Sequence, residues 1–127
     1  MPKHAAAMML LLVSIVAVGC GSSNRTADLA DRSMEDVVNE TDKLSVNGLE
    51  QRAAEYRDAI RAQNAKMQQL RQEEAKLDYN ERTGPKALEI GKRMKEVGRL
   101  VTRLVERHQE YMIKLREKGI DTSEYAY

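Results

Sequence analysis

Two long stretches of the chain carry a seam of mostly apolar residues at alternating intervals of three and four positions. In the first stretch the seam is Leu49, Ala53, Tyr56, Ile60, Gln63, Met67, Leu70, Glu74 and Leu77. In the second it is Ala87, Ile90, Met94, Val97, Val101, Leu104, His108, Tyr111 and Leu115. A mean period of about 3.5 residues is the heptad repeat of packed helices, whereas strands alternate with a period of about two. No other feature constrains the fold as strongly.

The break between the two seams indicates a tight reversal. Gly84 suits a helix cap and Pro85 suits the first helical position. Helices joined by a short turn run antiparallel. If facing residue numbers sum to 164, the seams match over eight layers, with Met67 opposite Val97. We therefore expect an all-α fold, an antiparallel two-helix coiled-coil hairpin with helices over about 48–80 and 85–118.

A short helix over about 34–46 is expected before the hairpin. Ser33 followed by Asp36 resembles a capping box, and apolar residues recur after it at helical spacing. Asn47 with Gly48 indicates a turn, in which Asn47 caps the next helix. Gly119 suits the C-terminal cap of the last helix. The helical domain is thus expected over 33–120, followed by a short polar tail, 121–127.

Composition and charge agree with one small helical domain. The chain has 127 residues, no Phe and no Trp, and a heptad-packed hairpin needs no large aromatic core. Its 21 basic and 20 acidic residues give no electrostatic signal for nucleic acid. The charges are unevenly placed: residues 25–50 hold seven acidic and three basic groups, and residues 86–107 hold seven basic and three acidic groups.

The first 19 residues have the pattern of a secretory signal peptide. Lys3 supplies a positive charge, and residues 5–18 form an uncharged, mostly apolar run. That run is shorter than the roughly 20 residues that a membrane-spanning helix needs. The domain is therefore expected to follow a leader that is removed.

The leader ends in Ala17, Val18, Gly19 and Cys20, and this motif resembles the lipobox of bacterial lipoproteins. The resemblance implies that Cys20, the single cysteine of the chain, is lipidated on sulfur and becomes the mature N-terminus. An ordinary secretory leader with a chance cysteine is the alternative. Stable attachment to a bilayer takes at least two acyl chains, which lipoproteins of this class carry. The mature part resembles small, uncharacterised helical lipoproteins of the cell envelope.

The residues after Cys20 bear on location. Gly21, rather than Asp, follows the lipidated cysteine. By resemblance to enterobacterial sorting, this implies the outer membrane, facing the periplasm, rather than the inner membrane. Residues 20–32 are polar and poor in large apolar residues, so we expect a flexible tether there.

The apolar face of the second long helix is wider than a two-helix seam requires, because a further stripe of small and apolar residues runs beside the seam. The stripe comprises Gly91, Gly98, Val105 and Met112. A helical glycine costs about 1 kcal/mol relative to alanine, so two of them, seven apart, suggest a close backbone approach. Three interpretations stay open: the 34–46 helix folds back over the Val105 and Met112 end, a second copy packs there, or another envelope protein docks a helix. A fourth is that the glycines have no role.

The sequence offers little material for catalysis or metal binding. His108, the one histidine after the leader, is expected to form a core polar pair opposite Tyr56. The methionines are expected to fill the core, and no cofactor or small-molecule site is predicted.

We expect a membrane-anchored, non-enzymatic envelope lipoprotein that acts as a helical scaffold or adaptor. The stripe Gly91, Gly98, Val105 and Met112 would bind a protein partner or a second copy. The alternatives are a periplasmic chaperone that holds unfolded clients and a regulatory lipoprotein subunit of a larger envelope complex. Covalent attachment to the cell wall, as in the murein lipoprotein family, is doubtful because that family ends in lysine and this chain ends in Tyr127.

Overall fold

The computed structural model describes residues 20–127, and within that range the protein is all-α, without strands. Its helices are α1 (Cys20–Asp31), α2 (Met34–Lys43), α3 (Val46–Ala75) and α4 (Pro85–Glu117). Short 3₁₀ helices occupy Glu81–Thr83 and Ser123–Tyr125. The predicted leader, residues 1–19, lies outside the described residues. The all-α class expected from the heptad repeat is confirmed.

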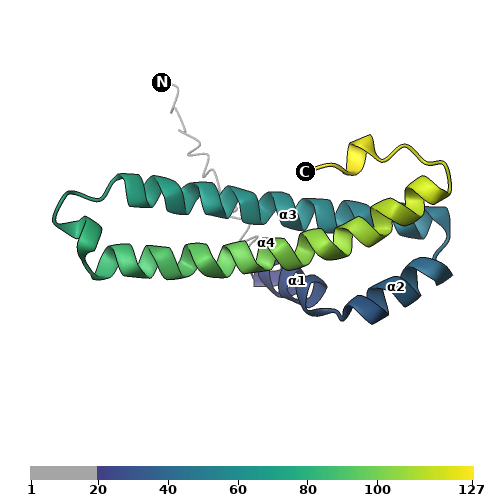
Figure 1. Ribbon diagram of the computed structural model, residues 1–127, viewed down its shortest axis with the longest axis horizontal. Coiled ribbons are helices and arrows are strands. Elements are labelled where there is room, and N and C mark those ends of the chain that lie inside the picture. The colour runs from purple at the N-terminus through teal and green to yellow at the C-terminus, as the bar shows by residue number, and fades with distance from the viewer. Residues whose placement is uncertain (1–19) are drawn as a thin grey trace, which may run out of the picture.

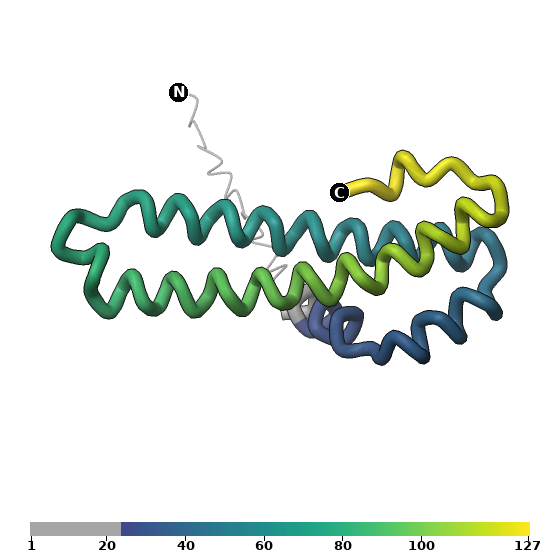
Figure 2. The backbone as a smooth tube through the Cα atoms, viewed as in Figure 1, coloured from purple at the N-terminus to yellow at the C-terminus, as the bar shows by residue number. Residues whose placement is uncertain are grey.

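The two long helices, α3 and α4, lie side by side and are joined by a loop at residues 76–84 (Figure 1). We call the loop end the tip, and the opposite end, where α3 begins and α4 ends, the base. The shorter helices α1 and α2 both contact α4 and lie toward the base. The C-terminal residues turn back from the base alongside α3 (Figure 2). The base is therefore thicker than the tip.

The seam positions are the buried positions of the long pair. All of them are buried or half-buried except Glu74, which is exposed near the tip. They contribute to two apolar clusters. The tip cluster comprises Leu70, Leu77, Ile90 and Val97. The base cluster comprises Leu29, Ala30, Val37, Leu49, Ala53, Tyr56, Ala59, Ile60, Leu104, Tyr111, Met112, Leu115 and Tyr125.

The base cluster corrects the expectation of a flexible tether over residues 20–32. Residues 20–31 form helix α1, in which Leu29 is 6% and Ala30 0% exposed. The adjacent pair buries its apolar surface against the base of α3 and α4, which stabilises a helix of weak intrinsic propensity. Arg32, the next residue, is held by its own hydrogen bonds. The polar composition of residues 20–32 therefore gave no sign that Leu29 and Ala30 attach this segment to the domain.

Several predicted helix ends are confirmed by their hydrogen bonds. The Ser33 hydroxyl accepts from the Asp36 amide at 3.0 Å and caps α2. Gly84 and Pro85 begin α4 as expected. Gly119 has φ +75°, and the Ile120 amide donates to the Leu115 carbonyl at 3.0 Å, which is the Schellman motif. These ends depend on local contacts that a sequence can specify.

Two helix ends differ from the prediction. Ser45, not Asn47, caps α3, because its hydroxyl accepts from the Gly48 amide at 3.3 Å. Helix α3 stops at Ala75 instead of continuing to about residue 80. Beyond it, the Asp78 carboxylate accepts from the Glu81 amide at 2.8 Å, and the Glu81 carboxylate accepts from the Asp78 amide at 3.2 Å. This reciprocal capping box favours a new 3₁₀ turn over further helix. The α2 helix likewise ends at Lys43, before the predicted residue 46.

Candidate functional site

The predicted lipidation site, Cys20, is the first residue of α1. Ten residues later the same helix is buried at Ala30, and α1 contacts α4. On the α3 side, Arg25 donates to the Glu55 carboxylate at 2.8 Å. The backbone that follows Cys20 is thus part of the fold.

The predicted partner-binding stripe is not one continuous exposed surface. Gly91 is exposed, and a Cβ built there meets nothing within 4 Å. Gly98 is half-buried, and a Cβ there would lie 3.9 Å from the Cε methyl of Met67 on α3, an ordinary contact. Val105 is half-buried against the base cluster, and Met112 is 7% exposed within it. Only the tip half of the stripe is open, and no other described backbone approaches its glycines.

The acidic N-terminal helices do return to the basic helix α4, as the charge asymmetry indicated. Asp31 pairs with Arg103 at 2.7 Å, and Asp42 pairs with Lys114 at 2.6 Å. In the heptad Lys114 is at a g position and Arg103 at a c position, and both lie on the side of α4 away from the Gly91 to Met112 stripe. The interpretation in which the 34–46 helix folds back is therefore right that this helix contacts α4. The ion pairs lie on the other side of α4 from Val105 and Met112. Met112 instead lines a pocket with Ala126 and Tyr127 of the C-terminal segment.

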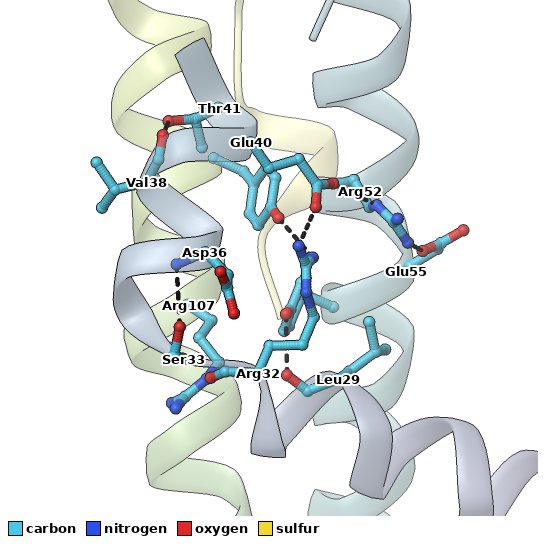
Figure 3. A network of polar contacts seen from close by, with 12 residues as sticks. Leu29, Arg32, Ser33, Asp36, Val38, Glu40, Thr41, Arg52, Glu55 and Arg107 are labelled. Carbon is cyan, nitrogen blue, oxygen red and sulfur yellow. Dashed lines mark hydrogen bonds and ion pairs between the residues drawn. The ribbon is translucent and has the colours of Figure 1, made fainter. Parts of the chain in front are cut away.

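A polar network links α1, α2, α3 and α4 at the base (Figure 3). The Arg32 guanidinium donates to the Glu40 carboxylate and to the Tyr111 hydroxyl, the latter at 3.0 Å. Arg52 of α3 donates to Glu40 at 2.7 Å and to Glu55 at 2.8 Å. The network ties the break between α1 and α2 to both long helices at once.

Buried donors extend this network into the helix pair. Arg107 is 8% exposed, and its Nε donates to the Arg32 carbonyl at 2.7 Å. The hydroxyl of Tyr56 donates to the Leu29 carbonyl at 2.9 Å. These two side chains satisfy carbonyls where the chain leaves α1, which would otherwise be costly to bury.

Electrostatics in the network favour its ionised, fully paired form. Burial opposes the charge of Glu40, but hydrogen bonds from Arg32 and Arg52 hold the pKa of its carboxyl below the ordinary value of 4.5. Burial, together with the negative charge of Glu40, raises the pKa of the Tyr111 hydroxyl to about 12. The rings of Tyr56 and Tyr111 stack on each other, with their centroids 5.5 Å apart. The carboxylate of Glu40 and the guanidinium groups of Arg32 and Arg52 are paired with one another, and the network joins the helices.

His108 is buried as expected, at 2% exposure, but its aromatic neighbour differs. Its ring meets Tyr127 edge-on, with centroids 5.4 Å apart, whereas Tyr56 stacks on Tyr111. A hydrogen bond joins His108 to the backbone of Tyr125, and Nε2 is buried without a partner. The Tyr56 hydroxyl donates to the Leu29 carbonyl and His108 bonds the Tyr125 backbone, so the ring contacts and hydrogen bonds of the two side chains go to other residues.

Sequence reasoning missed this network and the packed C-terminal segment. Among residues 20–127, no group of three or more His, Cys, Asp and Glu side chains is placed to hold a metal ion. No helix in the described range is long and apolar enough to cross a membrane. Comparison with known protein families, with curated proteins and with solved structures finds no match to this chain.

Proposed function

We propose that the protein is a non-enzymatic lipoprotein of the bacterial envelope, anchored through Cys20 and acting as a helical scaffold. The motif Ala17, Val18, Gly19 and Cys20 supports the anchor. The observation that carries the scaffold role is the direct continuation of Cys20 into α1, which packs on the domain. With no long linker between them, lipids on Cys20 would hold the domain close to the bilayer. By the sorting resemblance, that bilayer is the outer membrane on its periplasmic side.

The anchor is tested by cell fractionation of a Cys20→Ala variant. We expect the wild-type chain in the outer-membrane fraction and the variant in the soluble periplasmic fraction. Ser23→Ala, three residues away, is the matched control and stays with the membrane. Incorporation of an alkyne-bearing palmitate should be seen in the wild type and lost in Cys20→Ala. Membrane retention of Cys20→Ala without label would contradict the lipobox.

We also infer that α3 and α4 form an antiparallel coiled-coil hairpin in the register in which facing residue numbers sum to 164. Both apolar clusters draw on the predicted seams of the two helices. In a Cys20→Ala background, the pair Gln63→Cys and Val101→Cys should oxidise readily to a disulfide. The pair Gln63→Cys and Met94→Cys, one heptad out of register, should not. Equal cross-linking of both pairs would contradict this register.

The scaffold needs a partner surface, and the open tip half of the Gly91 and Gly98 stripe is our candidate. Leu88, one turn before Gly91, is 67% exposed and extends the apolar character of this surface. A photocrosslinking residue at position 88 in living cells should capture one defined protein partner. The same residue in place of Gln68, an exposed position on α3, serves as control. Capture of many unrelated unfolded proteins would support the chaperone alternative instead.

A further inference from the structure

The C-terminal segment, residues 121–127, packs over the buried side chain of His108. Tyr125 is 5% and Thr122 9% exposed, and Tyr127 lies edge-on to His108. The segment borders a pocket of about 360 Å³ lined by His108, Met112, Ile113 and Arg116 together with Ala126 and Tyr127. It thus separates His108 and part of the base cluster from solvent.

Most hydrogen bonds that hold residues 121–127 in place come from groups that keep their charge in neutral and mildly acidic solution. Arg57 donates to the Glu124 carbonyl at 2.8 Å, and Arg61 donates to the Ala126 carbonyl at 2.9 Å. Arg116 donates to the Thr122 hydroxyl at 3.1 Å. Guanidinium groups remain protonated throughout this range. The Tyr125 hydroxyl lies near the carboxylates of Glu124 and Glu50 and can donate its single proton to one of them at a time.

His108 is the exception, because its ordinary pKa of 6.5 lies within that range. Its Nε2 is buried with no acceptor beside it, so a proton added there has no hydrogen-bond partner. The charged groups that face it are cations, Arg57 from α3 and Arg116 from α4, and the segment itself presents the Tyr125 backbone and the Tyr127 ring. Burial, aided by these cations, lowers the pKa of His108.

From this geometry we propose that residues 121–127 form an acid-released strap, which lies closed over neutral His108 and opens when His108 takes up a proton. Opening would let solvent reach the imidazolium and would expose apolar surface of Met112 and Tyr125. The helices themselves stay folded, because every buried residue of the two clusters except Tyr125 lies outside the strap, as do the helix caps. The strap would therefore give the base of the protein a surface that is presented only in acid.

The experiment uses the full chain as bacterial cells produce it, purified in mild detergent and labelled with ¹³C at the tyrosine ring ε carbons. Between pH 7.5 and pH 5.0, the signals of Tyr125 and Tyr127 should move from native to random-coil positions, with a midpoint below pH 6.5. The signal of Tyr79, which is 88% exposed at the tip, should not move and serves as internal reference. Far-ultraviolet circular dichroism should keep its helical amplitude over the same range.

His108→Gln, which cannot titrate, is the matched variant, and its tyrosine signals should stay unchanged down to pH 5.0. The second measurement needs no variant: in a wild-type sample that also carries ¹³C in the histidine ring, the imidazole carbon signal of His108 should titrate with the same midpoint as the Tyr127 signal. Native Tyr125 and Tyr127 signals in the wild type at pH 5.0 would overturn the proposal. So would an equal change in His108→Gln, or a His108 midpoint separate from that of Tyr127.

Discussion

At the scale of single residues, Glu40 decides how the N-terminal helices attach to the long pair. Its carboxylate takes hydrogen bonds from Arg32 and Arg52, which approach from different elements. Glu40 and Arg32 keep only 18% and 25% of their side-chain surface exposed, so the pair is largely removed from water. A charge in such a position stabilises only while its partners are present.

Glu40→Gln should therefore lower the free energy of unfolding by about 2 kcal/mol, since Arg32 would keep its burial and lose its counter-charge. Urea unfolding at pH 7 followed by circular dichroism measures this. Asp58→Asn is the control, because Asp58 pairs with its neighbour Arg57 at 65% side-chain exposure. That control should change stability by less than about 0.5 kcal/mol. Equal losses in the two variants would show that the network carries no special weight.

The same carboxylate predicts a defined dependence of stability on pH. Because the pKa of Glu40 is lower in the folded chain than the ordinary 4.5, its ionised form favours folding. This contribution is complete above pH 4.5 and is lost as the pH falls through the folded value. Unfolding free energies measured between pH 6 and pH 3 should fall less steeply for Glu40→Gln than for the wild type. Parallel curves would argue against the Glu40 pairing.

At the scale of elements, the effect of a glycine on stability depends on the backbone conformation at its position. Gly119 lies at the end of α4 with φ +75°, a conformation that L side chains rarely adopt. Gly91 lies within α4 at an ordinary helical position. Neither would meet another atom within 4 Å if a Cβ were added, so only backbone conformation separates them.

Alanine at these two glycines should accordingly have opposite effects. Gly119→Ala should lower the free energy of unfolding by about 1 kcal/mol through the left-handed backbone. Gly91→Ala should raise it by up to about 1 kcal/mol, because alanine favours helix. Thermal unfolding of the two variants side by side measures both. A loss of stability in Gly91→Ala would mean that another backbone lies against this site, as in a self-associated form.

At the scale of the whole molecule, the distribution of apolar contacts is uneven along the long pair. The base cluster gathers side chains from α1, α2, α3, α4 and the C-terminal segment, whereas the tip cluster is built by the long helices and the loop alone. Glu74, the one exposed seam position, lies near the tip. Local opening should therefore begin at the tip, where the fewest contacts must break.

Native-state hydrogen exchange should resolve this gradient. Amides of α4 at residues 101–115 should exchange only through global unfolding, and those at residues 89–97 should open at a lower free energy. The two groups belong to one continuous helix, so helix propensity alone would protect them similarly. Uniform protection along α4 would show instead that the long pair unfolds as a single cooperative unit.

Several features could be predicted from the amino-acid sequence: the helical class, the buried seams of α3 and α4, and the caps at Ser33, Gly84 and Gly119. The helical class and the caps rest on interactions between residues a few positions apart, and the seams are visible because a heptad repeat marks the face that a partner helix covers. The sequence also indicated that acidic N-terminal residues lie along the basic helix α4.

The positions of residues 20–32 and 121–127 depend on contacts with distant parts of the chain and could not be predicted from local patterns. Leu29 and Ala30 stabilise α1 through burial against distant helices, and Tyr125 does the same for the C-terminal segment. Likewise, Arg32 meets a tyrosine 79 positions away, a separation at which no local pattern is visible. Isolated apolar residues in polar segments stabilise a fold only when the rest of the chain provides an apolar surface that buries them.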